Sequence, residues 1–145
     1  MVLAAAAGAV IGLDREHSQR AAGLRTNMLV SLAACLFTLT ALRLAEMADA
    51  AGEAARADPI RVIEAVTAGV AFIAAGSIIR ASHDVRGVTT AAALWLAGAA
   101  GVACGVGAFD LAGGAVGLAL IILVALGWLE DRVFKANRRR KGHED

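Results

Sequence analysis

The chain has few of the residues on which catalysis and metal binding usually depend. Its 145 residues include three histidines and two cysteines, Cys35 and Cys104, which lie in apolar runs and form no CxxC pair. A catalytic or metal-bound cysteine needs a thiolate with partners around it, so we interpret both as small packing residues. No Ser/His/Asp or Cys/His set for nucleophilic catalysis can be recognised either. The sequence therefore predicts a protein that is not an enzyme and has no cofactor.

Proline is also rare, with one residue against 16 glycines, and charged residues make up 19% of a chain that is 59% hydrophobic. With a mean hydropathy of +0.67, these fractions are compatible if the charges are confined to loops and a tail. Glycine is frequent in membrane helices because helices in lipid associate through close backbone approach. A signal-peptide pattern is missing as well, since residues 1–13 have no basic start and a charged turn follows them. We interpret residues 1–13 as a short first membrane helix, which either continues through that turn or begins upstream.

The longest uncharged stretch, Gly87–Phe109, has about 23 residues and would extend about 34 Å as a helix, more than the hydrocarbon core of about 30 Å. Four further uncharged runs accompany it. In chain order the five runs are Met1–Leu13, Thr26–Leu42, Ala65–Ile79, Gly87–Phe109 and Leu111–Leu129. They predict an all-α fold, a polytopic transmembrane bundle of about five membrane-spanning helices. We assign residues 1–131 to this domain and residues 132–145 to a basic cytoplasmic tail.

Helix boundaries can be predicted between the second and third runs. Asp58 as N-cap and Pro59 at the first helical position favour a helix start there. Arg61 and Glu64 then lie on one face, close enough to pair. Residues 43–58 are rich in helix formers and predict an extension of the second helix, a short helix on the membrane surface, or a solvated helical loop.

Basic residues are distributed unequally between the two sides that five spans create. Of the 14 Lys and Arg residues, three (Arg43, Arg56 and Arg61) fall on one side and the remaining eleven on the other. Short loops rich in Lys and Arg stay in the cytoplasm, so we expect the C-terminus inside and the N-terminus outside. The NRRRK run of the tail is explained by this topology and by contact with anionic lipid. No nucleic acid is expected as a partner, because no aromatic residue is interleaved with the run.

Glycines four residues apart predict close helix contacts in lipid. The pairs are Gly8 and Gly12, Gly101 and Gly105, and Gly113 and Gly117. At the start of the fourth run, Gly87 gives the chain freedom to turn, and a hydroxyl of Thr89 or Thr90 is expected to cap the helix. Trp95 lies deeper than an interfacial aromatic would, so we expect it to turn toward neighbouring helices, with a lipid-facing Trp95 as the alternative.

The predicted topology brings a set of polar residues to the cytoplasmic mouth of the bundle. They are Asp14, Arg15, Glu16, Arg25, Thr26, Arg80, His83, Asp84, Arg86, Thr89 and Thr90. Asp14 and Glu16 are candidate metal ligands, since carboxylates could bind Mg²⁺, but each has an arginine close by. A salt-bridged rim is therefore favoured over a metal site, and we expect Arg25 to pair with Asp14 or Glu16.

Five motifs follow one another along nearly the whole chain. They are G-L-D-R-E at Gly12–Glu16, A-G-L-R-T at Ala22–Thr26, D-P-x-R at Asp58–Arg61, G-V-A-F-I-A-A-G-S-I at Gly69–Ile78 and G-V-T-T-A-A-x-x-W at Gly87–Trp95. Together they resemble the MgtC/SapB family of bacterial inner-membrane proteins. The resemblance implies a multi-pass inner-membrane domain, associated in some members with growth in low magnesium and with virulence, and acting in some on other membrane proteins, the ATP synthase among them. The family-motif positions in this chain are Arg15, Glu16, Gly23, Arg25, Thr26, Asp58, Arg61, Gly69, Phe72, Gly76, Gly87, Thr89, Thr90 and Trp95.

The chain departs from the family pattern at a few positions. Asp14 stands where Glu is usual, and Ala71 and Ala74 replace glycines, so we expect the third helix to approach its neighbours less closely. The chain also ends soon after the fifth run, which favours a short, SapB-like form without the soluble C-terminal domain of the longer members.

Two classes of function follow from these patterns. The first is an inner-membrane regulatory or interaction protein, linked to magnesium homeostasis or adaptation to low magnesium, in contact with the bilayer and other membrane proteins and itself a homo-oligomer. The alternative is an ion transporter or channel for Mg²⁺. A carrier generally displays ionisable groups at mid-membrane, and the fourth and fifth runs have none. The sequence therefore leans toward regulation.

Overall fold

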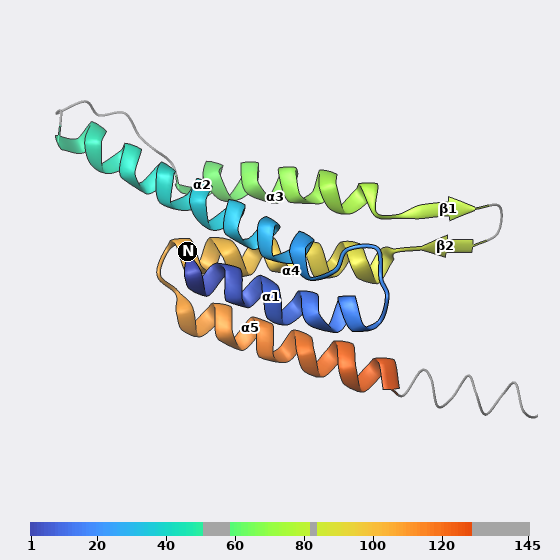
Figure 1. Cartoon of the computed structure of the whole chain (residues 1–145). Helices are drawn as coiled ribbons and strands as arrows, with labels where there is room; N and C mark the ends of the chain where they lie inside the picture. The colour runs from blue at the N-terminus through green and yellow to red at the C-terminus, as the bar shows by residue number, and fades with distance from the viewer. Residues whose placement is uncertain (51–58, 82–83, 129–145) are drawn as a thin grey trace, which may run out of the picture.

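Five α-helices and one short β-hairpin make up the chain in a computed structural model, which describes residues 1–50, 59–81 and 84–128 (Figure 1). The helices are α1 (Val2–His17), α2 (Leu24–Ala50), α3 (Pro59–Gly76), α4 (Val88–Gly105) and α5 (Phe109–Ile121), which a π-helical turn (Ile122–Leu126) extends. The strands β1 (Ile79–Ala81) and β2 (Asp84–Arg86) pair antiparallel, with Arg80 opposite Val85. The predicted all-α bundle with five helices is confirmed, whereas the hairpin was not predicted.

The helices run up and down alongside one another, so their connections gather at two ends of the bundle (Figure 1). One end, which we call the hairpin end, holds the α1–α2 connection, the β-hairpin, the start of α4 and the end of α5. The opposite end, the far end, holds the N-terminus, the start of α3 and the α4–α5 connection. The polar groups predicted to share one mouth therefore share the hairpin end; His83 lies outside the described residues.

The observed helices can be compared with the uncharged runs, some of which are shorter than a membrane span. In the described part of the chain, three helices are long and apolar enough to cross a membrane: α2, α4, and α5 with its π-helical turn. The first helix continues through the charged Asp14–Glu16 segment to His17, which gives it a length of about 24 Å. Residues 43–50 extend α2, as one of the predicted alternatives had it, and α3 begins at Pro59 as expected. Asp58, its predicted cap, lies outside the described residues.

The boundary between the last two helices differs from the prediction. Helix α4 ends at Gly105, because Gly107 adopts a left-handed φ of 82° and turns the chain. Helix α5 then begins at Phe109, so that Asp110 lies in its first turn. A carboxylate in the first turn of a helix is favourable because it faces the free N–H groups there. The charge at position 110 therefore belongs to a helix rather than to a loop.

Small residues form the core and large apolar residues form the outer surface. The buried positions are mostly alanines, glycines and cysteines, with Ile11 and Leu94 the largest apolar side chains among those fully buried. Outward-facing residues include Phe37, Leu111 and Phe72, whose exposed fraction reaches 83%. Such a surface would be a liability in water but suits lipid, where helices associate by close packing of small residues. The distribution of side-chain size thus supports a membrane location.

Candidate site at the hairpin end

A carboxylate from α1 caps the start of α2. The Oε2 atom of Glu16 accepts a hydrogen bond from the backbone N–H of Leu24, at 3.0 Å. Leu24 is the first residue of α2, so its N–H has no partner within the helix. The negative charge of Glu16 also faces the positive end of the helix dipole. Glu16 therefore fixes the angle at which α1 and α2 meet.

Gly23 is required by this contact. A Cβ atom at position 23 would collide with the carboxylate of Glu16. One turn back in α1, a Cβ at Gly12 would lie 2.7 Å from the Cα of Leu24, so the two helices are in backbone contact here. These glycines leave the room that the Glu16 cap needs.

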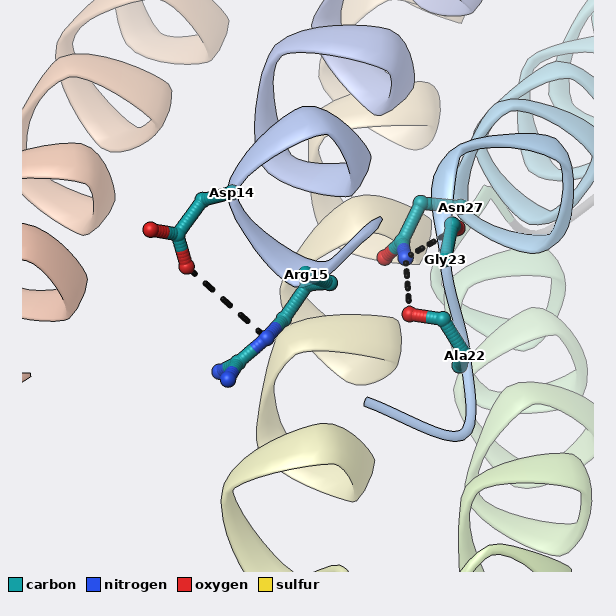
Figure 2. A network of polar contacts seen from close by, with 5 residues as sticks. All are labelled: Asp14, Arg15, Ala22, Gly23 and Asn27. Carbon is teal, nitrogen blue, oxygen red and sulfur yellow. Dashed lines mark hydrogen bonds and ion pairs between the residues drawn. The ribbon is translucent and has the colours of Figure 1, made fainter. Parts of the chain in front are cut away.

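Asn27 closes the same connection from inside the bundle. Its side chain is fully buried, and its Nδ2 donates to the carbonyl oxygens of Ala22, at 3.1 Å, and Gly23, at 2.9 Å (Figure 2). The Oδ1 of Asn27 has no hydrogen-bond partner among the described residues. Burying an amide in lipid is costly unless it is hydrogen-bonded, so Asn27 is held here by its two bonds to the connection.

Arg15 is a buried cation at this end of α1. Arg15 is 4% exposed. Its Nε lies 3.8 Å from the Oδ2 of Asp14, which makes an ion pair without a hydrogen bond. The Nε and Nη1 atoms have no hydrogen-bond partner within residues 1–50, 59–81 and 84–128. Figure 2 shows the guanidinium directed away from the amide of Asn27. A buried guanidinium with unpaired donors is costly and so marks a candidate functional site.

A stripe of polar side chains runs along the buried face of α2, and sequence reasoning missed it. Asn27, Ser31 and Thr38 are each buried, at spacings of four and seven residues that place them on one helical face. Thr38 Oγ1 donates to the carbonyl of Ala34 at 2.8 Å, whereas Ser31 Oγ has no partner in the described part of the chain. The signal was present in the sequence as polar residues at helical spacing within the run Thr26–Leu42.

Glycines of α1 and α4 pack against this polar stripe. A Cβ at Gly8 would lie 2.8 Å from the backbone carbon of Asn27, and one at Gly101 would lie 2.9 Å from that of Ser31. A Cβ at Gly105 would lie 2.6 Å from the Cβ of Thr38. The helices thus meet at backbone distance over the polar stripe and leave no room for a ligand there. Two of the three predicted glycine pairs make these contacts.

The hairpin joins this end through Gly87. Its φ of 90° lies in the left-handed region, and a Cβ there would collide with the backbone carbonyl of Ser77 at the end of α3. The predicted turn at Gly87 is confirmed. The predicted cap is wrong, because α4 begins at Val88 without any side-chain cap. Thr89 is exposed and Thr90 is buried, so their side chains lie within the first turn rather than before it.

Comparison with known proteins identifies the family. The model of the MgtC family matches residues 1–132 of the chain. The chain belongs to the MgtC family. The protein MgtC of Salmonella typhimurium strain LT2 is 37% identical over 131 residues, which cover 90% of this chain and 51% of that protein. The protein MgtC of Brucella abortus is 38% identical over 117 residues, 81% of this chain and 44% of that protein.

A further relative is an uncharacterized protein of Haemophilus influenzae, 35% identical over 128 residues, 87% of this chain and 52% of that protein. The chain thus spans about half the length of these curated relatives. No solved structure matches it.

The predicted family-motif positions do not converge on one site. Those at the hairpin end are Arg15, Glu16, Gly23, Arg25, Thr26, Gly87, Thr89 and Thr90. Arg61 lies in the first turn of α3, toward the far end. Gly69, Phe72 and Gly76 follow along α3, where a Cβ at either glycine would meet nothing within 4 Å. The predicted motif positions therefore include one polar cluster at the hairpin end and a second group along α3, where the glycines make no close contact.

Two predicted ion pairs are wrong. Arg25 is exposed and forms no ion pair with Asp14 or Glu16, whereas Arg15 pairs with Asp14. Glu16 is instead bonded to the backbone of α2, since the free N–H of Leu24 lies closer than the arginine side chain. Arg61 likewise forms no ion pair with Glu64.

The third helix and Trp95 lie near the expected places but make looser contacts. A Cβ at Gly98 of α4 would lie 2.9 Å from a methyl group of Val70, so α3 approaches α4 through side chains rather than backbone. This agrees with the expectation drawn from Ala71 and Ala74. Trp95 is 54% exposed and borders a shallow groove between α3 and α4 together with Thr67. Trp95 is therefore partly in contact with the α3–α4 groove and partly exposed on the outside, so neither predicted orientation, toward neighbouring helices or toward lipid, describes it fully.

In the part of the chain that the structure describes, no group of three or more His, Cys, Asp or Glu side chains lies close enough together to hold a metal ion. The candidate ligands Asp14 and Glu16 have other neighbours, a guanidinium and a backbone N–H respectively. Cys35 and Cys104 are both free and buried in a small cluster with Ala4 and Ala112.

Proposed function

We propose that this MgtC-family membrane domain is a regulatory or interaction protein of the bacterial inner membrane, linked to adaptation to low magnesium, and that it acts without catalysing a reaction. The family resemblance supports the link to magnesium. We place the hairpin end in the cytoplasm, since Arg15, Arg20 and Arg25 gather there. Other membrane proteins and further copies of the chain are the proposed partners.

The observation that carries this proposal is the buried Arg15. A cation held in the interior without hydrogen bonds from two of its nitrogens destabilises the fold, so a purely structural role does not account for it. Groups that cost stability in this way are typical of functional positions. The guanidinium lies at the hairpin end, beside the connection that Glu16 and Asn27 hold in place. We propose that this end carries the regulatory contact.

The test compares Arg15→Gln with the parent and with Arg43→Gln, which alters an exposed arginine of α2. The Arg15 variant should insert normally and be at least as thermally stable as the parent, because it removes a buried charge. It should nevertheless fail to support growth in low magnesium of a strain lacking its own family member, whereas Arg43→Gln should support it. If Arg15→Gln is less stable, or if it supports growth fully, the proposal is wrong.

Ion transport is the second candidate function, because the polar stripe of α2 places Asn27, Ser31 and Thr38 inside the bundle. Polar groups inside a membrane bundle often mark an ion pathway. The glycine contacts of α1 and α4 oppose this candidate, since they fill the space over the stripe. Magnesium flux into liposomes that contain the purified chain distinguishes the two functions, and flux that Ser31→Ala alters would favour transport.

A further inference from the structure

An apolar groove separates α2 from α3. It has a volume of about 560 Å³ and is lined along α2 by residues such as Val30 and Phe37, and along α3 by residues such as Val62, Gly69 and Ile73. A space of this size can bury a ligand of substantial length. We call it the α2/α3 groove.

The groove matches one leaflet of a bilayer in length. Its lining residues on α3 extend from Arg61 to Ile73, which corresponds to about 18 Å along the helix axis. Half of a hydrocarbon core of about 30 Å is about 15 Å. An occupant of the groove would therefore reach from the edge of the hydrocarbon core to about the bilayer midplane.

Arg61 is the charged residue among those that line the groove, and it lies at one end of it. It is exposed and forms no ion pair with any residue that the structure describes. Glu64 lies three residues further along α3, about 60° around the helix from Arg61, and forms no ion pair with it. The guanidinium is free to bind an anion at the membrane boundary, with its stem along the apolar wall.

Gly69 keeps the middle of the groove wide. A Cβ there would meet nothing within 4 Å, whereas a Cβ at Gly8 or Gly101 would press on the backbone of α2. The glycine at position 69 therefore does not serve packing between helices within the chain. It leaves space at the centre of the α2/α3 groove.

We propose that the α2/α3 groove binds one acyl chain of an anionic phospholipid, whose phosphate is held by Arg61. The apolar lining, the one-leaflet length and the single terminal cation together match a lipid with a negative headgroup better than a helix of another chain, which needs no anion at this end. This inference goes beyond the regulatory proposal and is independent of it.

Native mass spectrometry of the detergent-solubilised full chain tests this, with phosphatidylglycerol compared against phosphatidylcholine of the same chain length. The parent should retain phosphatidylglycerol preferentially. Arg61→Gln should lower that preference about fivefold, since one cation near an anionic lipid contributes about that factor. Arg43→Gln, which removes an arginine of α2 that does not line the groove, should leave the preference unchanged.

Gly69→Leu should reduce retention of both lipids, because the side chain projects into the groove from a position where a Cβ meets nothing within 4 Å. Gly113→Leu, at an open glycine of α5 that lines a different groove, is the matched control and should bind the α2/α3 lipid as the parent does. The proposal is overturned if Gly69→Leu retains phosphatidylglycerol normally, or if Arg61→Gln and Arg43→Gln lower the preference equally. It is also overturned if Gly69→Cys forms a disulfide-linked dimer in membranes, since a second copy would then occupy the groove.

Discussion

At the scale of single residues, the α1–α2 connection links two motifs through Glu16 and Leu24, which lie eight residues apart. Glu16 ends one motif and Leu24 lies in the next, and the hydrogen bond between them requires Gly23 to have no side chain. Asn27 then ties its amide to the carbonyls of the same connection. The spacing of the motifs is therefore set by one turn whose backbone groups are satisfied by side chains from both helices.

We predict that Glu16→Ala lowers the free energy of unfolding by about 1–2 kcal/mol, the usual cost of removing a helix cap. Glu16→Gln should cost less, because the amide oxygen still accepts the bond from Leu24 while the charge is lost. Thermal unfolding in detergent measures both. Glu46→Ala, an exposed carboxylate of α2 without a hydrogen bond among the described residues, is the control and should change stability by less than about 0.5 kcal/mol. Equal losses in the two alanine variants would contradict the capping role.

Sequence reasoning placed these residues at the correct end but gave them the wrong partners. The order of the apolar runs was enough to predict that Glu16 and Arg25 lie at the same end of the bundle. The choice between an arginine and a backbone N–H depends on the path of a six-residue connection, which charge patterns do not specify. Asn27 and Ser31 were overlooked because each is a single polar residue in an apolar run.

At the scale of elements, glycine has different roles in different helices. In α1 and α4 the glycines at positions 8, 12, 101 and 105 bring backbones into contact with α2. In α5, a Cβ at Gly113 or Gly117 would meet nothing within 4 Å. The same spacing therefore marks a packed face in two helices and an open face in the third.

We predict opposite effects of alanine at these two kinds of position. Gly8→Ala and Gly101→Ala should each lower the free energy of unfolding by about 1–3 kcal/mol, because the added methyl group overlaps backbone atoms of α2. Gly113→Ala should leave it unchanged or raise it by up to about 1 kcal/mol, because alanine favours the helix and the site is open. Denaturation of each variant in the same detergent gives the comparison. A loss of stability at Gly113 as large as that at Gly101 would show that the face of α5 is also packed.

The helices themselves were predictable, because uncharged runs between charges set their order and the Asp-Pro signal set the start of α3. The partner of each glycine face was not predictable, since spacing shows that a face is small but not what lies against it. The hairpin of β1 and β2 escaped prediction for a similar reason. Residues 80–86 contain several charges and predicted only a loop, and the third uncharged run was expected to stay helical to Ile79, whereas α3 ends at Gly76 and Ile79 begins β1.

At the scale of the whole molecule, small side chains lie in the core and large apolar side chains lie on the outer surface. Alanines and glycines fill the interior, while residues such as Phe72 and Leu111 cover the outside. Composition indicated close backbone approach between helices in lipid, through its 16 glycines in a chain that is 59% hydrophobic. It did not predict the groove between α2 and α3, which depends on the angle between two helices.

The arrangement of connections at two ends leads to a test of orientation. With Cys35 and Cys104 replaced by alanine, Ser18→Cys reports on the hairpin end and Val106→Cys on the far end, both at exposed positions. We expect a membrane-impermeant maleimide to label position 106 in intact spheroplasts and position 18 only after lysis. The reason is that five of the seven arginines in the described part of the chain (Arg15, Arg20, Arg25, Arg80 and Arg86) lie in or beside the short connections of the hairpin end, and basic residues there resist translocation. Labelling of position 18 before lysis, with position 106 protected, would reverse the orientation. It would place Arg15 and the proposed regulatory contact outside the cell, and Arg61 with its lipid in the cytoplasmic leaflet.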